Sequence, residues 1–288
     1  MQPIHGAIGP RRRHRHRPRR GFTLIELLIV ISIIALLIGI LLPSLATARK
    51  TAYAVQCQAH LKQLMVAMYA YCTDAKDFLP YTNSQSGETL DSNGDGAVDW
   101  LGKGWLYDRQ TMMTKAVDPW LPTSPVNAKQ EDAQSGAIYA YLQSDKIYHC
   151  PLDQKPTDWT PQDLSTVRPL TSYVMNRAMN GWNKTVLNWG TPAFRAFELR
   201  QDAVALWEAD EEQITDPPPG GDWNDGNNDP TQPVSLRHNN GGCIGMVDGS
   251  AKQVTRWQYE LMLAESPGPL WSNPLTPDGK EPAFAPLP

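Results

Sequence analysis

The sequence predicts an α+β fold, in which one long N-terminal helix packs on a small antiparallel sheet that carries large loop insertions. Three observations support this prediction. An almost unbroken apolar run of 21 residues covers positions 22–42, and an apolar stripe with helical spacing continues it over 57–72. Near the other end, two short runs within 243–255 flank Asp248-Gly249, a dipeptide typical of the type I′ turn of a hairpin.

The apolar run has the length of a membrane span. A helix rises about 1.5 Å per residue, so this run covers roughly 30 Å, the thickness of a bilayer's hydrocarbon core. Its single carboxylate, Glu26, costs on the order of 2.5–3.5 kcal/mol within a membrane. Two interpretations stay open, a partner for Glu26 or a shallow position near the headgroups. The helix is expected to run from about residue 22 to residue 73.

The charge distribution predicts how this span is oriented. Residues 1–20 contain seven arginines and no acidic residue, and the rest of the chain contains 19 basic and 30 acidic residues, a net charge of −11. Arginines directly before an apolar span favour a cytoplasmic N-terminus, with the globular part in the periplasm or outside the cell. The acidic remainder argues against nucleic acid as a partner.

The residues that begin the apolar run form a short motif. The sequence Gly21-Phe22-Thr-Leu-Ile-Glu26, followed by an apolar helix, resembles the prepilin leader of type IV pilins and type II secretion pseudopilins. The resemblance implies that a prepilin peptidase cuts after Gly21 and methylates the new amino terminus at Phe22. That cationic amine can meet the Glu26 carboxylate of a neighbouring subunit, which gives each buried charge a partner.

Two other targeting signals compete with this interpretation. Arg19-Arg20 resembles a twin-arginine export signal, and the small residues 46–48 resemble a signal-peptidase site. Against both, the apolar run is longer than the 7–15 residues of an ordinary signal, and it contains Glu26.

Four cysteines lie in the part that we expect to be exported, where an oxidising compartment permits disulfides. Two of them, Cys57 and Cys72, would be separated by roughly 22 Å on one helix, too far for a bridge. Two bridges would therefore join Cys57 to Cys150 and Cys72 to Cys243, or Cys57 to Cys243 and Cys72 to Cys150. Buried free thiols are the alternative. The chain has no CxxC pair, so we expect no zinc knuckle.

Residues 91–99 follow the pattern of a calcium loop. Oxygen-bearing side chains occupy the first, third, fifth and ninth positions of an EF-hand-like loop, at Asp91, Asn93, Asp95 and Asp99. The turn glycine is present as Gly96, but the twelfth position, usually glutamate, is Gly102. The sequence leaves Ca²⁺ binding and a plain acidic turn as alternatives, and it indicates no other cofactor.

A second motif lies near the C-terminus, where His238 is followed after nine residues by Asp248-Gly249. It resembles the H-x9-DG motif of a group of prepilin-type, processing-associated proteins. A structural role is favoured, in which Asp248 stabilises the turn and His238 binds a backbone carbonyl. No serine or cysteine nucleophile with a matching base accompanies these residues, so we do not expect an enzyme.

These observations predict five segments. They are a basic leader (1–21), a transmembrane assembly helix (22–43), its periplasmic continuation (44–78), a globular α+β domain that ends in the H-x9-DG hairpin (79–264), and an exposed Pro-rich tail (265–288). Short strands are expected at 172–176 and 203–207 within the globular domain.

The prediction for function is a pilin-like structural subunit with a single span in the inner membrane. The resemblance implies assembly into a type IV pilus or a type II secretion pseudopilus-like filament. Its partners would be like subunits, the prepilin peptidase and N-methyltransferase, and an assembly platform with its ATPase. The competing prediction is a membrane-anchored extracytoplasmic binding module for glycans or surfaces, favoured by ten tryptophans and by long loops at 81–135 and 214–233.

Overall fold

The computed structural model describes most of the chain outside its N-terminal leader and several loops. The described residues are 22–82, 89–90, 99–100, 103–107, 130–153, 171–179, 194–210, 226–274 and 276–280. The chain divides into two compact units, Met1–Thr47 and Ala48–Pro288.

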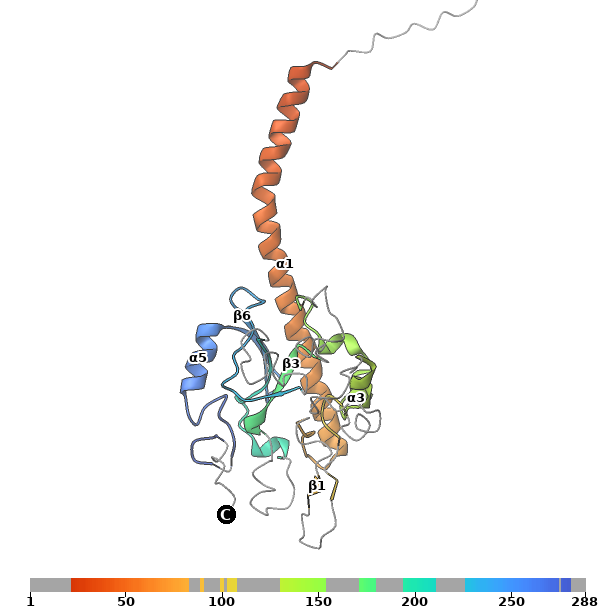
Figure 1. The fold of residues 1–288 in the computed structure, drawn as a ribbon, viewed down its shortest axis with the longest axis vertical. Coiled ribbons are helices and arrows are strands. Elements are labelled where there is room, and N and C mark those ends of the chain that lie inside the picture. The colour runs from red at the N-terminus through yellow and green to blue at the C-terminus, as the bar shows by residue number, and fades with distance from the viewer. Residues whose placement is uncertain are drawn as a thin grey trace, which may run out of the picture. The chain divides into compact units, whose positions relative to one another are not determined.

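Helix α1 spans Leu24–Asp74 and continues through Pro43 (Figure 1). Its bounds confirm the expected helix to within two residues. Every residue from Phe22 to Ala52 is exposed, although most of them as far as Leu45 are large and apolar. Among the described residues, α1 is the one helix long and apolar enough to cross a membrane.

Within the second unit, α1 buries one stripe of side chains. They recur at helical spacing, as the sequence predicted, and are Ala54, Cys57, His60, Leu61, Leu64, Met65, Ala67, Met68 and Cys72. The stripe packs on the sheet at Gly245, where a Cβ atom added to the glycine would lie 3.5 Å from the side chain of Leu61 and 3.6 Å from that of Met65. Tyr69 also donates a hydrogen bond to the carbonyl of Val247.

The main sheet has five strands in the order β5-β3-β4-β6-β7. Their bounds are β3 Tyr173–Asn176, β4 Val204–Glu208, β5 Asn227–Asn228, β6 Gly241–Met246 and β7 Ala251–Thr255. Strands β3, β4, β6 and β7 pair antiparallel, which confirms the predicted sheet. The edge strand β5 pairs parallel with β3. This pairing was not predicted, because a two-residue strand leaves no periodic pattern.

The two faces of the sheet belong to different apolar clusters. Residues of β4 and β6 alternate between them, so that Leu206 and Cys243 join the α1 stripe, whereas Trp207 and Ile244 face the other way. The second cluster includes Tyr259 of helix α5, Arg256–Ala264 (Figure 1). The sheet is thus covered on both faces by helices.

Short elements complete the described part of the chain. They are the strand pair β1 Thr89–Leu90 and β2 Asp99–Trp100, the short helix α3 Tyr139–Leu142, and the 3-10 helices η1 Gln130–Ser135, η2 Asp145–Tyr148, η4 Arg177–Met179 and η5 Ala196–Glu198. Strands β1 and β2 pair antiparallel with each other, apart from the main sheet.

The hairpin between β6 and β7 was predicted correctly, but the predicted turn type was wrong. A type I′ turn needs positive φ at both central residues. Here Gly249 has φ 81°, and Asp248 does not have positive φ. The Gly249 N–H donates to the Met246 carbonyl at 3.0 Å, so a four-residue turn ends on a left-handed glycine. Gly245 and Ala251 form the last residue pair before the turn, so the loop between the strands is longer than the two residues that Asp-Gly suggested.

The prediction of an exposed tail over 265–288 is wrong for residues 270–273, which are buried. Leu270 is fully buried in the cluster beneath α5. Its carbonyl accepts a hydrogen bond from Asn176 Nδ2 at 3.0 Å, and the Pro269 carbonyl accepts one from the Val204 N–H at 2.8 Å. Prolines prevent regular structure there without preventing packing.

Helix α5 begins with a capping box. Thr255 Oγ1 accepts a hydrogen bond from the Gln258 N–H at 3.2 Å, and Gln258 Oε1 accepts one from the Thr255 N–H at 2.9 Å. Replacing Thr255 with alanine is expected to lower the free energy of unfolding by about 1 kcal/mol. Thr255→Ser keeps the hydroxyl and is expected to lose much less, as measured by urea denaturation. Equal losses in both variants would contradict the capping explanation.

Candidate functional site

The first candidate site is the start of α1. Gly21 lies outside the described residues, and the Phe22 that follows it is 71% exposed. Glu26 Oε2 accepts hydrogen bonds from the Thr23 N–H at 2.9 Å and from Thr23 Oγ1 at 2.8 Å. In return, Thr23 Oγ1 accepts one from the Glu26 N–H at 3.2 Å. Glu26 is therefore a capping residue as well as the carboxylate of the motif, and the Thr-x-x-Glu spacing is the signal that indicates it.

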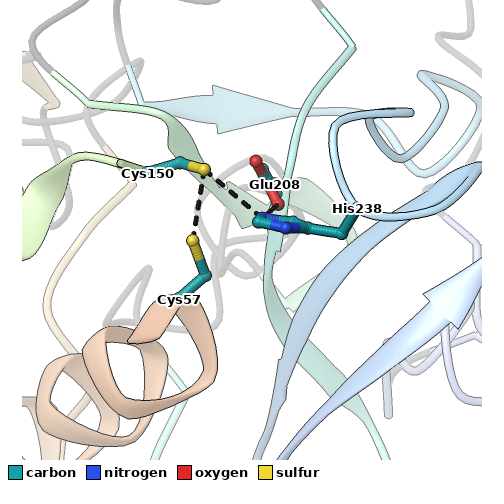
Figure 2. Close-up of side chains that lie close together, drawn as sticks. All are labelled: Cys57, Cys150, Glu208 and His238. Carbon is teal, nitrogen blue, oxygen red and sulfur yellow. Dashed lines mark hydrogen bonds and ion pairs between the residues drawn. The ribbon is translucent and has the colours of Figure 1, made fainter. Parts of the chain in front are cut away.

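The second candidate site is a buried polar cluster in the second unit, formed by Cys57, Cys150, Glu208 and His238, hereafter the core cluster (Figure 2). The two sulfur atoms are 3.1 Å apart, and Cys150 Sγ is 3.3 Å from His238 Nε2. The same Nε2 atom is 3.2 Å from Glu208 Oε2. Both members of that ion pair are fully buried.

Four separate segments bring these side chains together. Cys57 lies in the buried stripe of α1, Cys150 follows η2, Glu208 ends β4, and His238 precedes β6. One turn further along α1, His60 Nδ1 lies 3.1 Å from the His149 carbonyl, which fixes the backbone next to Cys150.

Local hydrogen bonds orient two members of the cluster. The Cys150 N–H donates to Ser172 Oγ at 2.9 Å. The His238 N–H donates to the Gly241 carbonyl at 2.8 Å, across a turn in which Asn239 and Asn240 have positive φ. Asparagine tolerates this conformation better than most residues, which explains its use twice in this turn.

The charges of the core cluster stabilise one another. Burial alone would raise the pKa of Glu208, but His238 and Arg237 outweigh it and lower that pKa below its usual value. Burial opposes the charged form of His238, yet its contacts with Cys150 and Glu208 raise the His238 pKa to about 9. Contact with Cys57, together with burial, raises the pKa of the Cys150 thiol. The charged forms of His238 and Glu208 thus stabilise each other.

Further groups support the carboxylate. Arg237 Nη1 lies 3.4 Å from Glu208 Oε1, and Arg237 Nη2 lies 3.3 Å from Asp153 Oδ1. The Cys243 N–H donates to Glu208 Oε2 at 3.3 Å. Sequence reasoning missed Glu208 and Arg237. The available signal was an acidic residue directly after the apolar run 203–207, where a buried charge needs a partner.

All four cysteines are buried and are free thiols in the structure. Cys57 and Cys150 come together, which is one of the pairs that the sequence left open. Cys243 Sγ instead lies 3.5 Å from the Ala54 carbonyl. Burial, together with the nearby negative charge of Asp77, raises the pKa of the Cys72 thiol to about 11. Disulfide pairing stays a prediction.

The H-x9-DG residues occupy different environments. His238 is fully buried, whereas Asp248 is exposed at the hairpin turn, where its Oδ1 accepts a hydrogen bond from the Ser250 N–H at 2.8 Å. The expectation that the His238 ring binds a backbone carbonyl is wrong. The ring contacts the side chains of Cys150 and Glu208, because its loop turns inward toward the end of β4.

The predicted calcium loop is mostly outside the described residues. Asp91, Asn93 and Asp95 fall there, and Asp99 is the first residue of β2. The backbone pairing of Leu90 with Asp99 shows that β1 and β2 flank this loop as a hairpin. Ca²⁺ binding by the loop stays a prediction.

Comparison with known proteins defines the class of the N-terminal segment. Residues 16–42 match the family model of the prokaryotic N-terminal methylation motif. This match covers Gly21, Phe22 and Glu26. The long apolar helix together with the antiparallel sheet is consistent with an α+β, pilin-like fold.

A particular relative is the type IV wide pilus major component PilA4 of Thermus thermophilus. The two chains are 43% identical over 70 residues, which are 24% of this chain and 51% of the relative. The chain thus spans about half the length of the curated relative that it matches. No solved structure matches the chain.

Proposed function

We propose that the chain is a pilin-like structural subunit, processed between Gly21 and Phe22 and assembled through α1 into a type IV pilus or a type II secretion pseudopilus-like filament. One observation carries the proposal. An apolar helix whose residues from Phe22 to Ala52 are all exposed begins inside the segment that matches the methylation motif.

An apolar helix in a protein core is buried by its own chain, whereas residues 22–52, which contain the first half of α1, are exposed. Its large apolar residues as far as Leu45 are between 44% and 86% exposed. Such a surface is stable in water only when something covers it. Lipid covers it before assembly in our proposal, and the helices of neighbouring subunits cover it afterwards.

The proposed location follows from the same segment. The helix is a single span of the inner membrane, with the arginine-rich N-terminus in the cytoplasm and the globular unit in the periplasm or outside. The partners are like subunits, the prepilin peptidase and N-methyltransferase, and an assembly platform with its ATPase. The resemblance of His238 and Asp248-Gly249 to the H-x9-DG motif supports a place among prepilin-type, processing-associated proteins.

The role proposed is structural rather than enzymatic. Similarity to a type IV pilus component favours a subunit over the binding module that the tryptophans suggested. Glycan-array binding by the mature protein, combined with its absence from sheared filaments, would reverse this preference.

The native amino terminus tests the processing step. Mass spectrometry of the chain purified from its membrane is expected to find N-methyl-Phe22 as the first residue. The variant Gly21→Val removes the small residue at the cleavage site, and it is expected to keep the leader and to accumulate in the membrane. A native chain that still carries residues before Phe22, or one that begins at Arg49, would contradict the proposal.

A further inference from the structure

The core cluster has a composition that an ion pair alone does not explain. Donor atoms of Cys57, Cys150, Glu208 and His238 all lie within 4.8 Å of one another, and all four residues are buried. We propose that the core cluster is a structural binding site for one divalent metal ion of the zinc class. The proposal rests on the second unit alone and does not depend on filament assembly.

The distances suit a single tetrahedral ion. The sulfur–sulfur, sulfur–imidazole and imidazole–carboxylate separations are 3.1, 3.3 and 3.2 Å. Zinc bonds of about 2.3 Å to sulfur and about 2.0 Å to nitrogen or oxygen place tetrahedral ligand atoms about 3.3–3.8 Å apart. These three separations are each within about 0.7 Å of tetrahedral values, and all four donor atoms lie within 4.8 Å of one another.

The donor types select the metal. Two thiolates and an imidazole favour Zn²⁺ over Mg²⁺ or Ca²⁺, which prefer oxygen ligands. Four protein ligands fill a tetrahedral shell and leave no position for a reacting water molecule. The site is consequently structural rather than catalytic, in agreement with the full burial of Glu208 and His238.

A metal ion would bind all four side chains of the core cluster at once, the charged pair as well as the two thiols. The pair of Glu208 and His238 is stabilised by its own charges, but the two thiols beside it are only weak hydrogen-bonding groups. Cys150 Sγ nevertheless lies against His238, and Cys57 Sγ lies against Cys150 Sγ (Figure 2). Binding an ion removes the protons of Cys57, Cys150 and His238, and the metal replaces them.

The surroundings of Glu208 resemble those of a metal-bound carboxylate. Ligating carboxylates are usually held by hydrogen bonds from a second layer of groups. Arg237 Nη1 donates a hydrogen bond to Glu208 Oε1, and the Cys243 N–H donates one to Glu208 Oε2. The ligands come from α1, the segment after η2, β4 and the loop before β6, so one ion would fasten the long helix to the sheet.

Metal loading of the full-length processed protein tests the proposal. The protein is purified in detergent, reduced, freed of metal, and dialysed against Zn²⁺ or Co²⁺ alone. We expect about one ion per chain, the ion count of one tetrahedral site. With Co²⁺ we expect thiolate-to-cobalt charge-transfer absorption, which needs no substitution and remains informative if a variant fails to fold.

Variants assign the binding to these residues. Cys57→Ser and His238→Ala are expected to lower the affinity for Zn²⁺ by more than about 100-fold, because loss of a supporting group alone lowers it by about 10–100-fold. Cys72→Ser is the matched control, since Cys72 is a buried cysteine of the same helix outside the cluster. It is expected to bind Zn²⁺ as the unsubstituted chain does.

Three results would overturn the proposal. The first is that the reduced protein binds no Zn²⁺. The second is that the Cys57→Ser variant binds Zn²⁺ as tightly as the Cys72→Ser variant does. The third is that mass spectrometry of the native protein, without reduction, finds a disulfide between Cys57 and Cys150 and no metal. That result would mean that the two sulfur atoms form a covalent bond instead of binding an ion. All of these measurements use dispersed protein, so they stand apart from the test of filament assembly.

Discussion

The variant Glu26→Val is expected to insert into the membrane normally and to enter filaments on the order of 100-fold less efficiently, or worse. Removing one member of a buried ion pair costs about 3–5 kcal/mol, because the other charge is left unpaired. In our proposal that other charge is the methylated amine of Phe22 in a neighbouring subunit. Each 1.4 kcal/mol is a factor of about ten in an equilibrium. Membrane fractionation measures insertion, and immunoblots of sheared filaments measure assembly.

The capping box at the start of α1 provides a control that separates two roles of Glu26. Glutamine also fits the third position of a capping box, so Glu26→Gln keeps the hydrogen bonds with Thr23 but removes the charge. Thr23→Val removes the hydroxyl half of the capping box and keeps the charge. Charge pairing predicts that Glu26→Gln assembles as poorly as Glu26→Val, while Thr23→Val still assembles. Normal filaments from Glu26→Gln would show that capping, and not charge, is the role of this residue.

Trp207→Ala is expected to lower the free energy of unfolding of the second unit by about 3–5 kcal/mol. Trp207 is fully buried in β4, and its ring centroid lies 6.1 Å from that of Tyr259 in α5. Removing the indole leaves a cavity between sheet and helix that the surrounding backbone cannot close. Urea denaturation of the detergent-solubilised protein, followed by circular dichroism, measures the loss.

Trp257 is the matched control for this variant. It lies in α5 and is 66% exposed, so Trp257→Ala is expected to change the free energy of unfolding by no more than about 0.5 kcal/mol. Similar losses from the two tryptophans would show that the second apolar cluster does not support the sheet in the way described.

Local patterns were sufficient for the elements that depend on them. The stripe from Cys57 to Cys72 predicted the buried face of α1, and the apolar run 203–207 predicted β4. Helix α5 was missed even though Thr255 and Gln258 have capping-box spacing, because nine residues carry only a weak apolar pattern. The turn type was also missed, since the pairing register of the two strands decides it as much as Asp-Gly does.

The core cluster was beyond sequence reasoning for a different reason. Its members are separated by between 30 and 181 positions in the chain, and no short spacing connects Cys57 or Cys150 to Glu208. Only the strand order β3-β4-β6 and the packing of α1 bring them together. His238 was singled out by its motif, but its partners depend on the tertiary fold. The start of α1 was predictable because its chemistry lies within six consecutive residues.

Helix α1 can transmit force, because one continuous helix contains both the exposed apolar residues and the buried stripe. If neighbouring subunits hold the apolar part, a pull on a filament loads this helix along its axis. The load leaves the helix through the stripe that begins at Ala54, where His60 contacts the His149 carbonyl and Tyr69 bonds the carbonyl of Val247. The sheet then resists shear along α1 at several contacts together. In a filament, the strength of one subunit under tension would then depend on how tightly the sheet packs on the second half of its helix.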